Sequence, residues 1–170
     1  MSLTKITIEQ KLDKEIALLL QHSSSENLPV PVAANLRKTR TYEDFLEDKM
    51  LIVVVIRMGI PYSLFSLIQH YTPFTENDWA TLLDLSTKSL QRYKQASKSF
   101  GPLQSEKIIE MAEVTKIGLD VFGDMEKFRG WLNTPSFALG GLEPMELLKD
   151  SYGKEMVIGE LVRIDHGVFV

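Results

Sequence analysis

The sequence contains no cysteine, and only three of its 170 residues are histidines. Disulfide bonds, zinc–thiolate sites and cysteine nucleophiles are therefore excluded, and the absence of cysteine is typical of a protein in a reducing cytoplasm. His22, His70 and His166 stand alone, without a second histidine or an acid at the spacing of metal ligands. We therefore expect no metal site.

Long apolar runs are also missing. The longest, Met50–Ile56, is far shorter than the roughly 20 residues that cross a bilayer. The N-terminal residues alternate acids with bases, which does not resemble a signal peptide. The sequence also lacks a Gly-rich phosphate-binding loop and a Gly-x-Ser-x-Gly nucleophile motif. We expect a cytoplasmic protein with no membrane span, no cofactor and no enzymatic activity.

The composition is that of an ordinary globular protein, with 44% hydrophobic and 25% charged residues. A chain of this length can bury a core and form one domain or two small ones. Its net charge of −4 excludes a uniformly basic, non-specific nucleic-acid binder. Any contact with DNA must therefore come from a local basic surface.

Apolar residues recur at helical spacing along most of the chain, which predicts an all-α fold. Residues 4–21 are interpreted as a helix or an arm followed by a polar linker. One helix is expected from Tyr42 to the Gly59-Ile60-Pro61 break, although the β-branched run Ile52–Ile56 leaves a strand as the alternative. Thr75 and Asp78 form an approximate capping box at the start of another helix. The remaining helices are expected over residues 61–71, 87–96, 103–122, 125–132, 144–149 and 154–165.

The segment 75–96 has the form of a helix-turn-helix unit, in which the second helix presents polar and basic side chains to the major groove. Between Ser86 and Lys98 there are four bases and no acids, so the rest of the chain has a net charge of −8. The alternative is an ordinary solvated surface helix, and Asp84 adds an acid where a small glycine is usual in the turn. The candidate DNA-binding residues are Thr87, Lys88, Gln91, Arg92, Lys94 and Lys98.

An ordered set of short motifs follows in the last 50 residues. The motifs are Phe122-Gly123-Asp124, Trp131-Leu132, Thr134-Pro135, Ala138-Leu139-Gly140-Gly141, Pro144, Glu146-Leu147-Leu148, Gly153 and Leu161-Arg163-Ile164-Gly167. In order and spacing, this run resembles the toxin-binding domain of the Xre/MbcA/ParS antitoxins. Upstream, Gly59-Ile60-Pro61 and Leu90-Gln91-Arg92-Tyr93 resemble the family's Xre-like helix-turn-helix domain.

The resemblance covers roughly residues 45–170 and implies an Xre-like helix-turn-helix domain (42–118) and a small helical toxin-binding domain (119–170). Residues 1–41, which it does not cover, are expected to form an N-terminal helix or arm and a linker. It further implies that the protein binds and neutralises a RES-type toxin with an ADP-ribosyltransferase-like fold that acts on NAD. A homodimer, a hetero-oligomer with the toxin and repression of its own operon through operator DNA are expected. The alternative is a stand-alone helix-turn-helix transcriptional regulator whose C-terminal domain dimerises or binds another partner.

Individual C-terminal residues suit two kinds of role. Trp131 is large enough to hold the core of a small domain, and Pro135, Gly140 and Gly141 shape its backbone. Arg163, a planar cation near the end of the last helix, is either a contact for the cleft of the toxin or an exposed arginine that the helix dipole favours. The final residues are unusually apolar, which suggests that they dock either onto the partner or back onto this domain. With Arg163, the candidate toxin contacts are His166, Val168, Phe169 and Val170.

Overall fold

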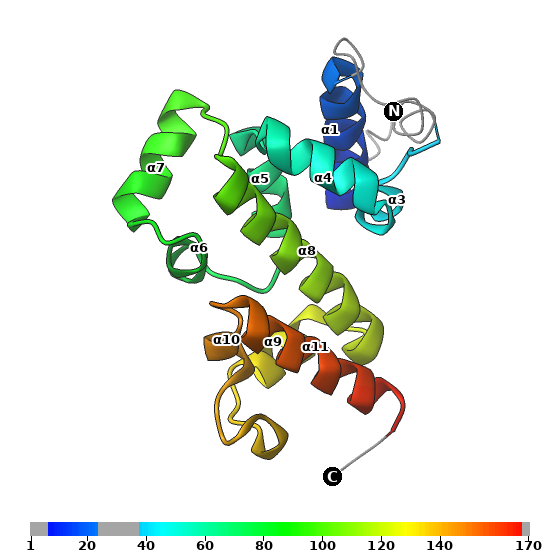
Figure 1. Cartoon of the computed structure of the whole chain (residues 1–170), viewed down its shortest axis with the longest axis vertical. Coiled ribbons are helices and arrows are strands. Elements are labelled where there is room, and N and C mark those ends of the chain that lie inside the picture. Colours follow the sequence, from blue (N-terminus) through cyan, green and yellow to red (C-terminus); the bar gives the residue numbers. More distant parts are fainter. Residues whose placement is uncertain (1–6, 24–37, 168–170) are drawn as a thin grey trace, which may run out of the picture. The chain divides into compact units, whose positions relative to one another are not determined.

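A computed structural model describes residues 7–23 and 38–167 of the chain (Figure 1). Helices make up its regular structure, and no strand occurs in those two ranges, which hold only two isolated β-bridges. The all-α prediction is therefore confirmed. No helix among the described residues is long and apolar enough to span a membrane. The helices are α1 (Ile8–Ser23), α3 (Tyr42–Glu47), α4 (Lys49–Met58), α5 (Tyr62–His70), α6 (Glu76–Leu82), α7 (Thr87–Ala96), α8 (Pro102–Phe122), α9 (Met125–Leu132), the short 3-10 helix η1 (Phe137–Leu139), α10 (Pro144–Leu147) and α11 (Ser151–Asp165).

The described residues form two compact units, and the chain passes between them three times. The first unit contains the residues before Thr72 together with Lys88–Ile109, and the second contains Thr72–Thr87 together with the residues from Glu110 onwards. The boundary between Ile109 and Glu110 lies inside α8. The long helix predicted over 103–122 is therefore present and contributes residues to both units.

In the first unit, α1 packs against α3 and α5. Leu12 and Ile16 of α1 are buried, as Phe45 and Leu64 are. The start of α3 is fixed by a capping box in which the Thr41 hydroxyl accepts from the Asp44 N–H. Backbone N–H groups of Arg40 and Thr41 donate in return to Asp44 and lower the pKa of that carboxyl. These local bonds fix the start of α3, and the Tyr42 N–H joins it to α1 by donating to the Asp13 carboxylate at 2.7 Å.

The prediction of one continuous helix from Tyr42 to the Gly59 break is wrong in one respect. The structure divides this segment into two helices at Asp48. This residue has extended backbone angles, φ −96° and ψ 95°, and its side chain accepts from the N–H groups of Met50 and Leu51. An aspartate that satisfies the first N–H groups of a helix acts as an N-cap, so it ends α3 and starts α4. The run Ile52–Ile56 is helical, which removes the strand alternative.

The junction of α4, α5 and α8 is held by backbone and side-chain bonds in the first unit. Gly59 has φ 89°, and a Cβ there would lie 2.4 Å from the Phe100 carbonyl oxygen. The Ile60 N–H donates to the buried Ser105 hydroxyl at 2.8 Å, and the Ile60 carbonyl accepts from the Phe100 N–H at 2.8 Å. Tyr62 N–H also donates to the Lys98 carbonyl. The Gly59-Ile60-Pro61 break is therefore a fixed turn.

In the second unit, α6 begins with the expected capping box between Thr75 and Asp78. Trp79 of α6 is fully buried and meets Phe74 edge to face. The second half of α8 contributes buried Met111 and Val114. An ion pair of 2.7 Å joins Lys154 of α11 to Glu110 of α8, and both side chains are largely buried.

The last helix starts earlier than expected. It begins at Ser151, with Asp150 as its N-cap, and not at Lys154. Gly153, which we expected to precede the helix, is buried within its first turn, where a Cβ would lie 2.0 Å from the Leu147 carbonyl oxygen. The glycine is therefore required because α10 packs closely against α11. Residues 133–141, for which no helix was expected, contain η1, and α10 ends at Leu147 and not at Lys149.

Candidate functional sites

The basic surface predicted from the charge pattern lies on and just after α7. All six candidate DNA-binding side chains are exposed, five of them on α7 and one beyond its end. They are Thr87, Lys88, Gln91, Arg92, Lys94 and Lys98. We call this set the basic surface. Because its four cations are solvated and no acid lies between them in the sequence, the surface is suited to phosphate contacts.

The opposite side of α7 is anchored in the first unit. Leu90 is buried, and the ring of Tyr93 stacks on Phe100 with centroids 4.6 Å apart and an interplanar angle of 2°. Phe100 also meets Phe65 of α5 at 4.9 Å. This aromatic cluster fixes the rotation of α7, so the basic residues face away from the core.

Two turn residues with positive φ define the ends of α6 and α7. Asp84 has φ 53° and follows α6, where the N–H of Leu85 donates to the Ala80 carbonyl. Ser97 has φ 48° and follows α7, where the Lys98 N–H donates to the Tyr93 carbonyl. Both are Schellman-type helix ends, for which glycine is the common residue. Asp84 thus occupies the left-handed position that a glycine would occupy more easily.

In the second unit, three aromatic side chains cluster between α8 and α9. Trp131 lies 5.7 Å from Phe122 and 6.3 Å from Phe128 between ring centroids. Phe128 is fully buried, and a Cβ at Gly118 would overlap its ring at 2.3 Å. Trp131 is only partly buried at the edge of this cluster. The fully buried tryptophan is Trp79, to which the sequence analysis assigned no special role.

The loop after α9 is closed by its own backbone. The Ser136 N–H donates to the Leu142 carbonyl at 3.0 Å, and the Gly141 N–H donates to the Ser136 carbonyl at 2.8 Å. Gly140 and Gly141 have φ 72° and 79°, angles that favour glycine. Pro135 is exposed just before this loop. The loop presents Phe137, whose side chain is 91% exposed, and this residue was missed in the sequence analysis.

The last turn of α11 carries the described toxin-contact candidates. The Arg163 guanidinium forms an ion pair of 2.6 Å with Glu160 one turn earlier, and its side chain remains 46% exposed. His166 is the exposed C-cap of the helix. Val168, Phe169 and Val170 lie outside the described residues. Tyr152, at the other end of α11, is 83% exposed and was also missed.

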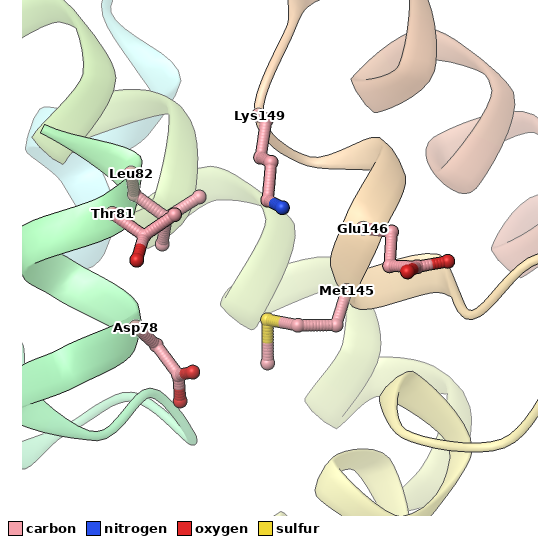
Figure 2. Close-up of a pocket in the computed structure, with 6 residues that line it drawn as sticks. All are labelled: Asp78, Thr81, Leu82, Met145, Glu146 and Lys149. Carbon is pink, nitrogen blue, oxygen red and sulfur yellow. The ribbon is translucent and has the colours of Figure 1, made fainter. Parts of the chain in front are cut away.

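A small pocket lies in the second unit between α6 and α10. Figure 2 shows the Asp78 carboxylate and the Lys149 ammonium group on different sides of it, with the Met145 side chain between them. The Glu146 carboxylate points away from Asp78 in the same view. In residues 7–23 and 38–167, no group of three or more histidines or acids is placed to hold a metal ion. The Thr81 hydroxyl at this pocket donates to the Asn77 carbonyl of its own helix at 3.0 Å.

Two models of protein families match this chain, one over the helix-turn-helix segment and one over the C-terminal segment. Residues 52–113 match the model of the antitoxin Xre-like helix-turn-helix domain, and residues 118–167 match that of the antitoxin Xre/MbcA/ParS C-terminal toxin-binding domain. Antitoxin Xre of Yersinia enterocolitica is 28% identical over 120 residues, which are 70% of this chain and 81% of that protein. Antitoxin Xre of Photorhabdus laumondii is 25% identical over 115 residues, 67% of this chain and 78% of its own.

A solved structure shares the fold. A chain in the crystal structure of the M. tuberculosis MbcT–MbcA toxin-antitoxin complex aligns with a TM-score of 0.52 and 22% identity, over 62% of this chain and 94% of its own length. The helix-turn-helix domain followed by the C-terminal helical domain defines an antitoxin of a toxin-antitoxin system. The domains that these two models match, over residues 52–113 and 118–167, are those of the Xre/MbcA/ParS antitoxins.

Proposed function

We propose that this antitoxin neutralises a RES-type toxin, an ADP-ribosyltransferase-like enzyme that acts on NAD, by binding it directly through residues 119–170. The observation that carries the proposal is the match of residues 118–167 to a domain described as toxin-binding. The exposure of Arg163 and His166 at the end of α11 supports a contact there. We assign the residues from 42 to 118 to the helix-turn-helix domain, and we place the complex in the cytoplasm as a hetero-oligomer of antitoxin homodimers and toxin.

Expression together with the product of the neighbouring gene, which the proposal takes to be a RES-type toxin, tests the proposal. We expect the two proteins to copurify, and we expect the antitoxin to restore the growth of cells that the toxin alone arrests. Arg163→Ala is expected to weaken binding, since a guanidinium that enters a cleft for phosphate or nicotinamide groups loses its bonds there. Failure to copurify, together with failure to restore growth, would overturn the proposal.

A second function, repression of the operon, is favoured by the basic surface on α7. The four cations and their acid-free neighbourhood match the electrostatic requirement of DNA binding. We expect the protein to shift a fragment of its own promoter in a gel. Replacing Lys88, Arg92 and Lys94 with alanine is expected to reduce operator affinity at least tenfold, since phosphate contacts supply much of the binding. Replacing Lys11, Lys14 and Lys49, which are lysines outside the basic surface, provides the control. Unchanged affinity in the first variant would exclude α7 as the DNA-binding helix.

A further inference from the structure

One side of α11 is exposed along the whole helix. Its side chains recur at intervals of four, three, four and three residues, which places them within about 80° of one another around the helix axis. We call this set the outer stripe. It consists of Tyr152, Met156, Gly159, Arg163 and His166, all of which are exposed. Gly153, Val157 and Leu161 form a different side of the helix, which is buried in the second unit.

The first half of the outer stripe, Tyr152 and Met156, is apolar where solvent exposure favours polar side chains. Tyr152 is 83% exposed and Met156 is 48% exposed. Phe137, 91% exposed, extends from η1, which packs against the same helix. Large apolar side chains gathered on one element of a small domain mark interaction surfaces more often than isolated ones do. Tyrosine, phenylalanine and methionine are also the residues enriched at protein–protein interfaces.

No neighbouring atom in the second unit requires a glycine at position 159. Gly118 and Gly153 are required because a Cβ would overlap Phe128 or the Leu147 carbonyl, whereas a Cβ at Gly159 would meet nothing within 4 Å. A glycine inside a helix costs about 1 kcal/mol relative to alanine. Gly130 of α9 is open in the same way. What distinguishes Gly159 is its place between the exposed Met156 and Arg163, where the absence of a side chain allows another backbone to approach the helix closely.

We infer that the outer stripe is the surface on which the toxin packs, with Tyr152 and Met156 as apolar anchors and Gly159 as the point of closest approach. The inference rests on the proposed function and specifies where the toxin lies. The stripe is continuous with Arg163 and His166 and falls wholly within the residues that match the toxin-binding domain. Glu155 is exposed next to Met156, and Arg163 is exposed at the other end of the stripe, so a complementary partner surface has an apolar centre, a basic side chain near one end and an acceptor for Arg163 near the other.

Two variants test the outer stripe against purified toxin by isothermal titration calorimetry. Gly159→Trp fills the point of closest approach, and Tyr152→Ala removes an anchor. We expect each to weaken toxin binding at least tenfold, as the loss of a central aromatic anchor does at other interfaces. Gly130→Trp is the matched control, because Gly130 is also a helix glycine whose Cβ would meet nothing within 4 Å. Circular dichroism and thermal unfolding of each variant check that the helices are intact.

The outcomes separate this inference from the proposed function. If the unmodified protein does not bind the toxin, the proposed function fails and the inference fails with it. If it binds and both stripe variants bind equally well, only the inference is overturned. Equal losses in Gly159→Trp and Gly130→Trp would also overturn it, because the effect would not be specific to the stripe. A stripe variant that dissociates antitoxin dimers and keeps its affinity for toxin would assign the stripe to a second copy of this chain.

Discussion

At the scale of single residues, the backbone angle of Asp84 in the turn after α6 lowers the stability of the fold. Asp84 has φ 53°, a left-handed angle that a residue with a Cβ adopts at an expense that glycine avoids. Its backbone N–H still donates to the Thr81 carbonyl, so the turn is held by hydrogen bonds in spite of this cost. The conformational cost at this position therefore comes from the backbone angle and not from the aspartate side chain.

Asp84→Gly is expected to raise the free energy of unfolding by about 1 kcal/mol, because it removes the left-handed penalty. Asp84→Ala is the control, because it removes the same charge and keeps a Cβ. We expect alanine to leave stability unchanged or lower it. Urea denaturation followed by circular dichroism measures both values. Equal stabilisation by the two variants would show that charge, and not backbone conformation, governs this turn.

Two glycines on α11 are expected to respond in opposite ways to alanine. Gly153→Ala places a Cβ 2.0 Å from a backbone carbonyl oxygen and is expected to destabilise the protein by about 2 kcal/mol, the range of an overpacked core. Gly159→Ala fills open space and is expected to stabilise it by about 0.5–1 kcal/mol. Thermal unfolding of the two variants checks the order. Similar effects at both positions would contradict the close packing of α10 on α11.

At the scale of elements, the junction of α4, α5 and α8 depends on one buried hydroxyl. The Ser105 oxygen accepts from the Ile60 N–H at 2.8 Å and donates to the Phe100 carbonyl at 3.3 Å. This hydroxyl therefore bonds both the segment before α5 and the segment before α8. It links segments 45 residues apart.

Ser105→Ala is expected to lower the free energy of unfolding by about 1–3 kcal/mol, because it leaves the buried Ile60 N–H without an acceptor. The nearby exposed Ser99 offers a comparison, and Ser99→Ala is expected to change stability by less than about 0.5 kcal/mol. Chemical denaturation measures both. A Ser105→Ala protein as stable as the unmodified chain would show that the junction is held by backbone bonds and packing alone.

Local signals in the sequence were sufficient for some elements and not for others. The capping box of Thr75 and Asp78 and the exposed basic residues of α7 depend on neighbours within one or two turns, so both were predicted. The break at Asp48 was missed because the apolar pattern continues through it. The early start of α11 was missed because Gly153 is typical of a helix end, and only the contact with Leu147 shows why it lies inside the helix.

The outer stripe was missed for the same reason as the start of α11. A helix that begins at Lys154 excludes Tyr152, so the spacing of Tyr152, Met156, Gly159 and Arg163 does not stand out as one face. The signal is present in the sequence once the helix is extended by three residues. Trp79 and Trp131, in contrast, cannot be ranked by burial from spacing alone, since burial depends on contacts between distant segments.

At the scale of the whole molecule, charge is divided unevenly along the chain. The four cations between Ser86 and Lys98 stand against a net charge of −4 for the entire sequence. We expect the logarithm of operator affinity to fall with the logarithm of salt concentration with a slope of roughly −3.6 per protomer, the value for four neutralised phosphates. Fluorescence anisotropy over a range of salt concentrations measures the slope. A slope near zero would exclude phosphate contacts by the basic surface.

The division of the fold into two units has a consequence for anyone who wishes to transplant the toxin-binding part. The second unit includes Thr72–Thr87, with the fully buried Trp79, as well as the chain from Glu110 onwards. A gene fragment that starts at residue 119 would omit that tryptophan and the stretch of α8 that supplies Glu110, the ion-pair partner of Lys154. The compact unit that holds the proposed toxin-binding residues 119–170 thus comes from two separate pieces of the sequence, and a fusion protein or a chimaera has to carry both of them to keep that unit whole.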